Sequence, residues 1–77
     1  MTTQEWLQTK IAEEAGMQVE EIALDAPFES FSLDSLSVIT LAYELESFTG
    51  KDSIDPSVFS EYNTINKLSE WVNQQSQ

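Results

Sequence analysis

Residues 34–50, which read DSLSVITLAYELESFTG, decide the fold that we predict for this chain. Their apolar side chains recur at steps of three and four residues, which is the spacing of one face of an α-helix. An aspartate is favoured just before a first helical turn and a glycine just after a last one, so we expect a helix over 35–49. Its predicted buried stripe comprises Val38, Leu41, Ala42, Leu45 and Phe48.

Ser35 stands at the first position of this helix. A hydroxyl there is expected to be exposed, beside unpaired N–H groups and the positive end of the helix dipole. That environment suits a phosphate. The chain has no cysteine or histidine that could activate a serine nucleophile, so we interpret Ser35 as a place where a group is attached. The residues alone leave open a plainer interpretation, in which Asp34 and Ser35 only begin a helix.

A second row of apolar side chains lies on a flank of the same helix. Leu36, Ile39 and Tyr43 either complete the core or form an exposed edge that contacts partners, and the pattern leaves both open. Exposed apolar residues near a charged rim are a common interface anatomy. Glu44 and Glu46 are interpreted first as a solvated face, with docking as the alternative.

The rest of the chain also has helical spacing. Thr2 and Glu5 form a capping-box pattern that begins a helix over 3–15, which Gly16 ends. Asp55-Pro56 opens a short helix over 56–61, and Thr64 caps a last helix over 64–73. Pro27 prevents a helix through 17–34, so we expect a long structured loop there, attached to the core by apolar side chains. The predicted fold is all-α, a small four-helix bundle with a short third helix.

Composition narrows the function. The chain has 77 residues, a net charge of −11 and three lysines as its only basic side chains, so one domain over 1–77 is expected and nucleic-acid binding is very unfavourable. The acidity favours basic protein partners. No apolar run is long enough to span a membrane, and the first residues lack the pattern of a signal peptide, which predicts a cytoplasmic protein. We expect a monomer, no metal site and no catalytic site of its own.

Residues 28–36, FESFSLDSL, resemble the F-x-x-L-G-x-D-S-L signature of acyl carrier proteins. Further matches follow at family spacings along essentially the whole chain. They are Val19, Ile22 and Leu24 before the signature, Leu41, Leu45, Glu46 and Gly50 in the second helix, and Ile54, Phe59, Tyr62, Thr64, Ile65 and Leu68 in a closing region that is similar to the Y-P-T-I segment of polyketide and peptide synthases.

The resemblance implies a function for several of these residues. Ser35 would carry 4′-phosphopantetheine, donated covalently by coenzyme A, and the terminal thiol of that arm would hold acyl groups as thioesters. Asp34 would help a phosphopantetheinyl transferase recognise the site. Ketosynthases, acyltransferases or other pathway enzymes with basic patches would dock on the outer face of the second helix. The docking residues expected from the resemblance are Leu36, Ile39, Thr40, Tyr43 and Glu46.

Some positions depart from the family pattern. Ser32 replaces a glycine, so the loop is expected to bend differently, and Asn63 replaces a proline. Thr40 and Ser47 stand where carriers of fatty-acid biosynthesis have acids, which favours a specialised carrier of polyketide or related secondary metabolism. Three alternatives stay open: an aminoacyl or peptidyl carrier, an acidic adaptor domain that is never modified and, weakly because no calcium-loop pattern occurs, a calcium-binding module. A start at Met1 and a polar tail fit a free-standing protein and an excised domain alike.

Overall fold

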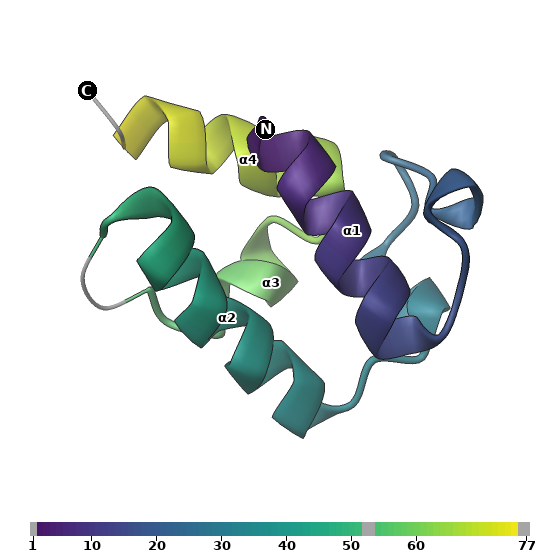
Figure 1. Cartoon of the computed structure of the whole chain (residues 1–77). Coiled ribbons are helices and arrows are strands. Elements are labelled where there is room, and N and C mark those ends of the chain that lie inside the picture. The colour runs from purple at the N-terminus through teal and green to yellow at the C-terminus, as the bar shows by residue number, and fades with distance from the viewer. Residues whose placement is uncertain (1, 52–53, 76–77) are drawn as a thin grey trace.

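The structure, a computed structural model, describes residues 2–51 and 54–75. These residues form the helices α1 (Thr3–Ala15), α2 (Ser35–Thr49), α3 (Val58–Glu61) and α4 (Ile65–Gln75). Two short 3-10 turns, η1 (Val19–Glu21) and η2 (Phe28–Phe31), lie between α1 and α2. In Figure 1, α1 and α2 run in opposite directions, α4 lies beside the start of α1, and the short α3 lies between α2 and α4. The predicted all-α bundle with a short third helix is confirmed.

One apolar core joins the four helices and η2. The side chains of Leu7, Ile11, Leu41, Leu45 and Leu68 are completely shielded from solvent. Burying a side chain of this size contributes roughly 1.5–3 kcal/mol to folding, which is large for a domain this small. The remaining buried apolar residues are Trp6, Ala12, Ile22, Phe28, Phe31, Ala42, Ile54, Val58, Phe59, Ile65 and Val72.

The ends of α1 and α2 follow the sequence signals. The Glu5 N–H donates to Thr2 Oγ1 at 3.1 Å and the Thr2 N–H donates to Glu5 Oε1 at 2.9 Å, which is the expected capping box. Gly16 and Gly50 close the two helices in the left-handed region, at φ 68° and 74°. Glycine adopts that conformation without a steric penalty, so both helices end where the sequence predicts.

The long connection between α1 and α2 is structured, as expected. Ile22, Phe28 and Phe31 are buried in the core, and Leu24 is half-buried. Backbone hydrogen bonds attach the loop to the other end of the chain: the Phe28 N–H donates to the Asn63 carbonyl at 2.8 Å, and the Asn66 N–H donates to the Leu24 carbonyl at 3.1 Å. These contacts fix the direction from which the chain enters α2.

The expected bounds of the last two helices need correction. The helix expected over 56–61 begins only at Val58, because Phe59 and Ser60 donate to the carbonyls three residues before them, Pro56 and Ser57. Such bonds make a tight turn rather than an α-helical start. The helix expected over 64–73 is Ile65–Gln75: Thr64 is its cap, with Oγ1 accepting the Lys67 N–H at 3.1 Å, and its polar end stays helical for two further residues.

The expected buried stripe of α2 was also partly wrong. Leu41, Ala42 and Leu45 are buried, but Val38 is half-buried and Phe48 is 37% exposed. The Phe48 ring stacks on Trp6 of α1 with 4.9 Å between ring centroids. Phe48 therefore closes the edge of the core rather than lying inside it.

Candidate functional site

Ser35 is the first residue of α2 and is exposed. The capping role belongs to its neighbour: Asp34 has an extended backbone, its Oδ1 accepts the Ser37 N–H at 2.8 Å, and its carbonyl accepts the Val38 N–H at 3.0 Å. Since Asp34 begins the helix, the Ser35 hydroxyl is not needed for capping and faces solvent. The position predicted for both residues is confirmed.

The Asp34 carboxyl at this helix start is ionised at neutral pH. The hydrogen bond from the Ser37 backbone N–H, and after it an interaction with the Ser37 side chain, lower the pKa of the Asp34 carboxyl below its usual range. A carboxylate near a helix N-terminus is also stabilised by the helix dipole. An exposed, fully ionised carboxylate therefore stands next to the Ser35 hydroxyl at neutral pH.

The residue that replaces a glycine in the loop before α2 has an unusual backbone. Ser32 ends η2 with φ 58° and ψ 35°, in the left-handed region. Residues other than glycine rarely occupy it, and they do so at a cost of roughly 1–2 kcal/mol. Ser32 thus takes the conformation that glycine adopts most easily, and its strain is local to the entrance of α2.

A shallow groove of about 380 Å³ lies beside Ser35, between the start of α2 and the turn before α3. It continues into a hollow of about 290 Å³, with which it shares Leu33, Val38 and Ser60. The groove is lined by Leu33, Asp34, Ser35, Val38, Ile39, Pro56, Ser57 and Ser60. Sequence reasoning did not place Pro56, Ser57 and Ser60 near Ser35, because Asp55-Pro56 was interpreted only as the start of a short helix.

The apolar flank of α2 is an exposed edge. Leu36 is 71% exposed, Ile39 is 52% exposed and Tyr43 is 72% exposed. Thr40 is exposed on the same helix. The alternative in which Leu36, Ile39 and Tyr43 complete the core is therefore wrong. We name these four residues, Leu36, Ile39, Thr40 and Tyr43, the α2 edge.

Glu46, the fifth expected docking residue, has a different contact. Its Oε2 accepts the Ile54 N–H at 2.8 Å, and the side chain is half-buried. The carboxylate thereby attaches the segment after α2 to the helix. The structure does not bring Glu46 to the α2 edge as a free acid.

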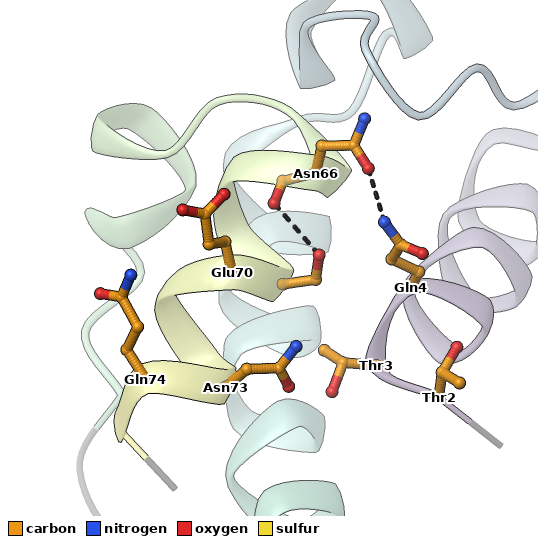
Figure 2. Close-up of a pocket in the computed structure, with 8 residues that line it drawn as sticks. Thr2, Thr3, Gln4, Asn66, Glu70, Asn73 and Gln74 are labelled. Carbon is orange, nitrogen blue, oxygen red and sulfur yellow. Dashed lines mark hydrogen bonds between the residues drawn. The ribbon is translucent and has the colours of Figure 1, made fainter.

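A more voluminous surface hollow, of about 880 Å³, lies elsewhere and is polar (Figure 2). It lies between the start of α1 and α4, where Gln4 Nε2 donates to Asn66 Oδ1 at 2.6 Å. Among the described residues, Glu70 is the charged residue that lines it, and Ser35 is not part of it. Across residues 2–51 and 54–75, no cluster of acids could hold a metal ion and no helix is long and apolar enough to cross a bilayer.

Comparison with known families settles what kind of domain this is. The family described as the phosphopantetheine attachment site matches residues 5–72. The chain belongs to this family. Its members are carrier domains that tether intermediates on covalently attached phosphopantetheine and have no catalytic site of their own.

Individual relatives agree with this family. Over 70 residues the carrier is 31% identical to polyketide synthase PksL of Bacillus subtilis (strain 168); the match covers 91% of this chain and 2% of that synthase. A free-standing peptidyl carrier protein from an uncharacterised Acinetobacter baumannii secondary metabolic pathway superposes with a TM-score of 0.90 at 30% identity, over 96% of this chain and 91% of that one. The HMG-ACPI domain of the CurA module from Lyngbya majuscula has the same fold, with a TM-score of 0.86 at 22% identity over 95% and 73% of the two chains.

Proposed function

We propose that this chain is an acyl carrier protein whose Ser35 carries the 4′-phosphopantetheine arm. The observation that supports the proposal best is an exposed serine at the first position of α2, within the segment that matches the family. The arm would hold acyl intermediates as thioesters and deliver them to enzymes of polyketide or other specialised biosynthesis. The 31% identity to a polyketide synthase favours that pathway class. We place the whole of 1–77 in one carrier domain, acting as a cytoplasmic monomer.

The residues around Ser35 fit a phosphodiester. The N–H group of Ser35 lies in the first turn of α2, where the helix offers it no carbonyl partner, and the dipole there favours an anion. The Asp34 carboxylate repels a phosphate, but both groups would stand in solvent, where the high dielectric constant of water weakens the repulsion. The groove beside Ser35 offers the arm an apolar wall in Leu33, Val38 and Ile39.

Once attached, the arm supplies a thiol, and the chain supplies position. Tethering converts the encounter of an intermediate with each enzyme into a reaction at high effective concentration. The absence of histidine and cysteine is compatible with this role, since the protein needs neither a base nor a thiolate of its own. Asp34, exposed and ionised, would help a phosphopantetheinyl transferase recognise the site through its magnesium ion or its basic residues.

We assign docking of pathway enzymes to the α2 edge. Ketosynthases, acyltransferases and similar partners would cover its apolar side chains and surround them with basic groups that complement the net charge of −11. Glu46 is the weakest member of the expected docking set, because the Ile54 N–H already engages its carboxylate.

A peptidyl carrier is the second candidate. The Acinetobacter baumannii peptidyl carrier protein, 30% identical with a TM-score of 0.90, favours it specifically. The two candidates differ in the enzymes that accept the loaded chain. Transfer rates from acyl- and aminoacyl-loaded protein to a polyketide ketosynthase and to a peptide-synthetase condensation domain would separate them: an acyl carrier is expected to be used faster by the ketosynthase.

The attachment site is tested by intact mass after incubation with coenzyme A, magnesium and a promiscuous phosphopantetheinyl transferase. The wild type is expected to gain one phosphopantetheine, and Ser35→Ala none, with its helical circular dichroism unchanged. Ser37→Ala, two residues further along the same helix, is the matched control and should be loaded. A folded wild type that stays unmodified while the transferase loads a standard carrier would overturn the proposal, as would a modified Ser35→Ala.

A further inference from the structure

A second groove, of about 560 Å³, runs between α1 and α2 and does not include Ser35. Figure 1 shows these two helices running in opposite directions. Its residues, which we name the α1–α2 groove, are Trp6, Lys10, Thr40, Tyr43, Glu44, Ser47 and Phe48. Four of them, Trp6, Lys10, Ser47 and Phe48, were not among the docking candidates considered from the sequence.

The groove displays aromatic surface from Phe48 and Tyr43, and its floor is the buried Trp6 ring of the core, which is 8% exposed. Trp6 and Phe48 are stacked at 4.9 Å with 18° between their planes, and Phe48 is still 37% exposed. Tyr43, at 72% exposed, stands beside them. Aromatic residues are enriched in the centres of protein interfaces, because they bury much apolar area with little loss of side-chain entropy.

The rim of the groove is acidic. Lys10 Nζ lies 3.8 Å from Glu13 Oε1 and 3.8 Å from Glu44 Oε2, and 5.9 Å above the Trp6 ring. One lysine therefore serves two carboxylates, whose side chains are 64% and 40% exposed. The excess negative charge is complementary to a basic partner and repels a second copy of this chain.

The dimensions suit a helix. Thr40 and Phe48 are eight residues apart, which spans about 12 Å along α2 at about 1.5 Å per residue, or roughly two helical turns. An amphipathic helix lying in such a groove places side chains at i, i+3, i+4 and i+7 into it. Ser35 does not line the groove, and Tyr43 lies eight residues beyond it on α2, so a helix centred on Tyr43 would leave Ser35 exposed.

We propose that the α1–α2 groove binds a basic amphipathic helix of a partner protein. An apolar side chain of that helix packs beside Tyr43 over the Trp6–Phe48 stack, and a lysine or arginine next to it pairs with Glu44. The partner is held to the carrier while the arm at Ser35 remains free to enter an active site. This role as an anchor rests on the proposed function, whereas the binding of the helix does not.

The binding is tested by titrating the ¹⁵N-labelled, unmodified chain with a synthetic helical peptide that has a leucine–phenylalanine face flanked by arginines. The control peptide has glutamates in place of the arginines. The expected result is a set of shifts centred on the Trp6 indole N–H and the backbone of 40–48 with the arginine peptide only. Equal binding of the glutamate peptide, or shifts centred on another face, would overturn the proposal.

Two variants with matched controls sharpen the test. Ser47→Trp fills the groove and is expected to weaken the arginine peptide at least roughly tenfold, whereas Asn73→Trp on α4 should not. Glu44→Lys is expected to weaken it roughly three- to tenfold, and Glu70→Lys, which changes the net charge equally, less than about twofold. Unchanged affinity in Ser47→Trp contradicts the proposal. So does a dimer in sedimentation that Ser47→Trp abolishes, since the occupant is then a second copy.

Failure of this proposal and failure of the attachment proposal are distinguishable. The titration uses unmodified protein, so it gives an answer whether or not Ser35 accepts the arm. If Ser35 accepts phosphopantetheine but the arginine peptide does not bind, only the groove proposal is overturned. Binding in the groove without loading overturns the attachment site alone.

Discussion

The helices α2 and α4 use their apolar side chains in different ways. In α4 the apolar residues Ile65, Leu68 and Val72 are at most 1% exposed, and the half-buried Trp71 stacks on Tyr62 with 5.6 Å between ring centroids. In α2, Leu41 and Leu45 are equally buried, yet Leu36 and Tyr43 on the same helix are 71% and 72% exposed. A helix that only packs needs one apolar face, as α4 shows. The surplus on α2 therefore indicates surface that other molecules cover.

The residues that cap the two helices also differ in exposure and charge. α4 begins at Thr64, an uncharged and buried cap whose Oγ1 accepts the Lys67 N–H. α2 begins at Asp34, an exposed and ionised cap, after a serine at φ 58°. The buried cap of α4 stabilises the fold. The start of α2 instead follows a strained backbone at Ser32 and exposes the Asp34 carboxylate beside the Ser35 hydroxyl.

Shortening a leucine on each helix would test this difference most directly. Leu68→Ala on α4 is expected to lower the free energy of unfolding by about 2–5 kcal/mol, because it leaves a cavity in the core. Leu36→Ala on α2 is expected to change it by less than about 0.5 kcal/mol. Urea unfolding followed by circular dichroism measures both. Comparable losses in the two variants would show that Leu36 packs like a core residue.

For the kinetics with partner enzymes we expect the reverse: substitutions on α2 should lower kcat/KM more than a substitution on α4. Leu36→Ala and Tyr43→Ala are each expected to lower kcat/KM of the transferase or of a pathway enzyme roughly tenfold, since buried apolar anchors dominate interface energies. Glu70→Ala on the exposed side of α4 is the control and should stay within about twofold of the wild type. An equal effect of Glu70→Ala would remove the distinction between the two surfaces.

Removing the strain before α2 should stabilise the protein. Ser32→Gly relieves a left-handed φ and is expected to raise the free energy of unfolding by roughly 0.5–1 kcal/mol, after the larger chain entropy of glycine is counted. Ser30→Gly in η2 is the matched control and should destabilise, because no strain is relieved and the Ser30 hydroxyl loses its bond to the Pro27 carbonyl. A loss of stability in Ser32→Gly would show that the left-handed backbone of Ser32 does not destabilise the protein.

The smallest expected effect is the pH dependence of stability that comes from the Asp34 cap of α2. The folded-state pKa of Asp34 is lowered by the Ser37 N–H, so its stabilising charge is fully present above its usual pKa of about 3.9 and is lost as pH falls through the folded value. Asp34→Asn keeps a capping oxygen without the charge. The Tm difference between wild type and Asp34→Asn should therefore be largest near pH 6 and shrink toward pH 2.

Two further variants control that pH experiment. Thr64→Ala removes the neutral cap of α4, and its Tm deficit should not vary with pH in the same way, because Thr64 does not titrate. Glu70→Gln removes one surface charge without touching a cap and corrects for the general repulsion within an acidic chain. A Tm difference for Asp34→Asn that follows the Glu70→Gln profile would show that the cap charge contributes nothing specific.

Much of the fold followed from local patterns. The ranges 3–15 and 35–49 coincide with α1 and α2, because Thr2, Glu5, Asp34 and the two glycines give each helix a chemical start and stop. The exposed position of Ser35 followed from the same logic. Its role as the attachment residue stays a prediction. The family match shows that phosphopantetheine is attached covalently, but it does not identify the residue.

Contacts between distant segments could not be predicted from local spacing. Phe48 has the spacing of a core residue, but it reaches the edge of the bundle and stacks on Trp6, which is 42 positions earlier in the chain. The start of α3 was placed two residues early because Asp55-Pro56 favours a helix locally, whereas the chain winds a tight turn there first. In both cases tertiary packing decided between locally acceptable alternatives.

The hydrogen bond from the Ile54 N–H to Glu46 has a consequence for redesign of partner choice. Position 46 is constrained from inside the molecule, so exchanging its acid to suit a new enzyme would also release the segment after α2. In the part of the chain that the structure describes, the side chains of Thr40 and Ser47 on the same helix have no such bond to the backbone after α2. Acidic residues introduced at those neutral positions, by design or by evolution, can therefore change partner choice while Glu46 is kept.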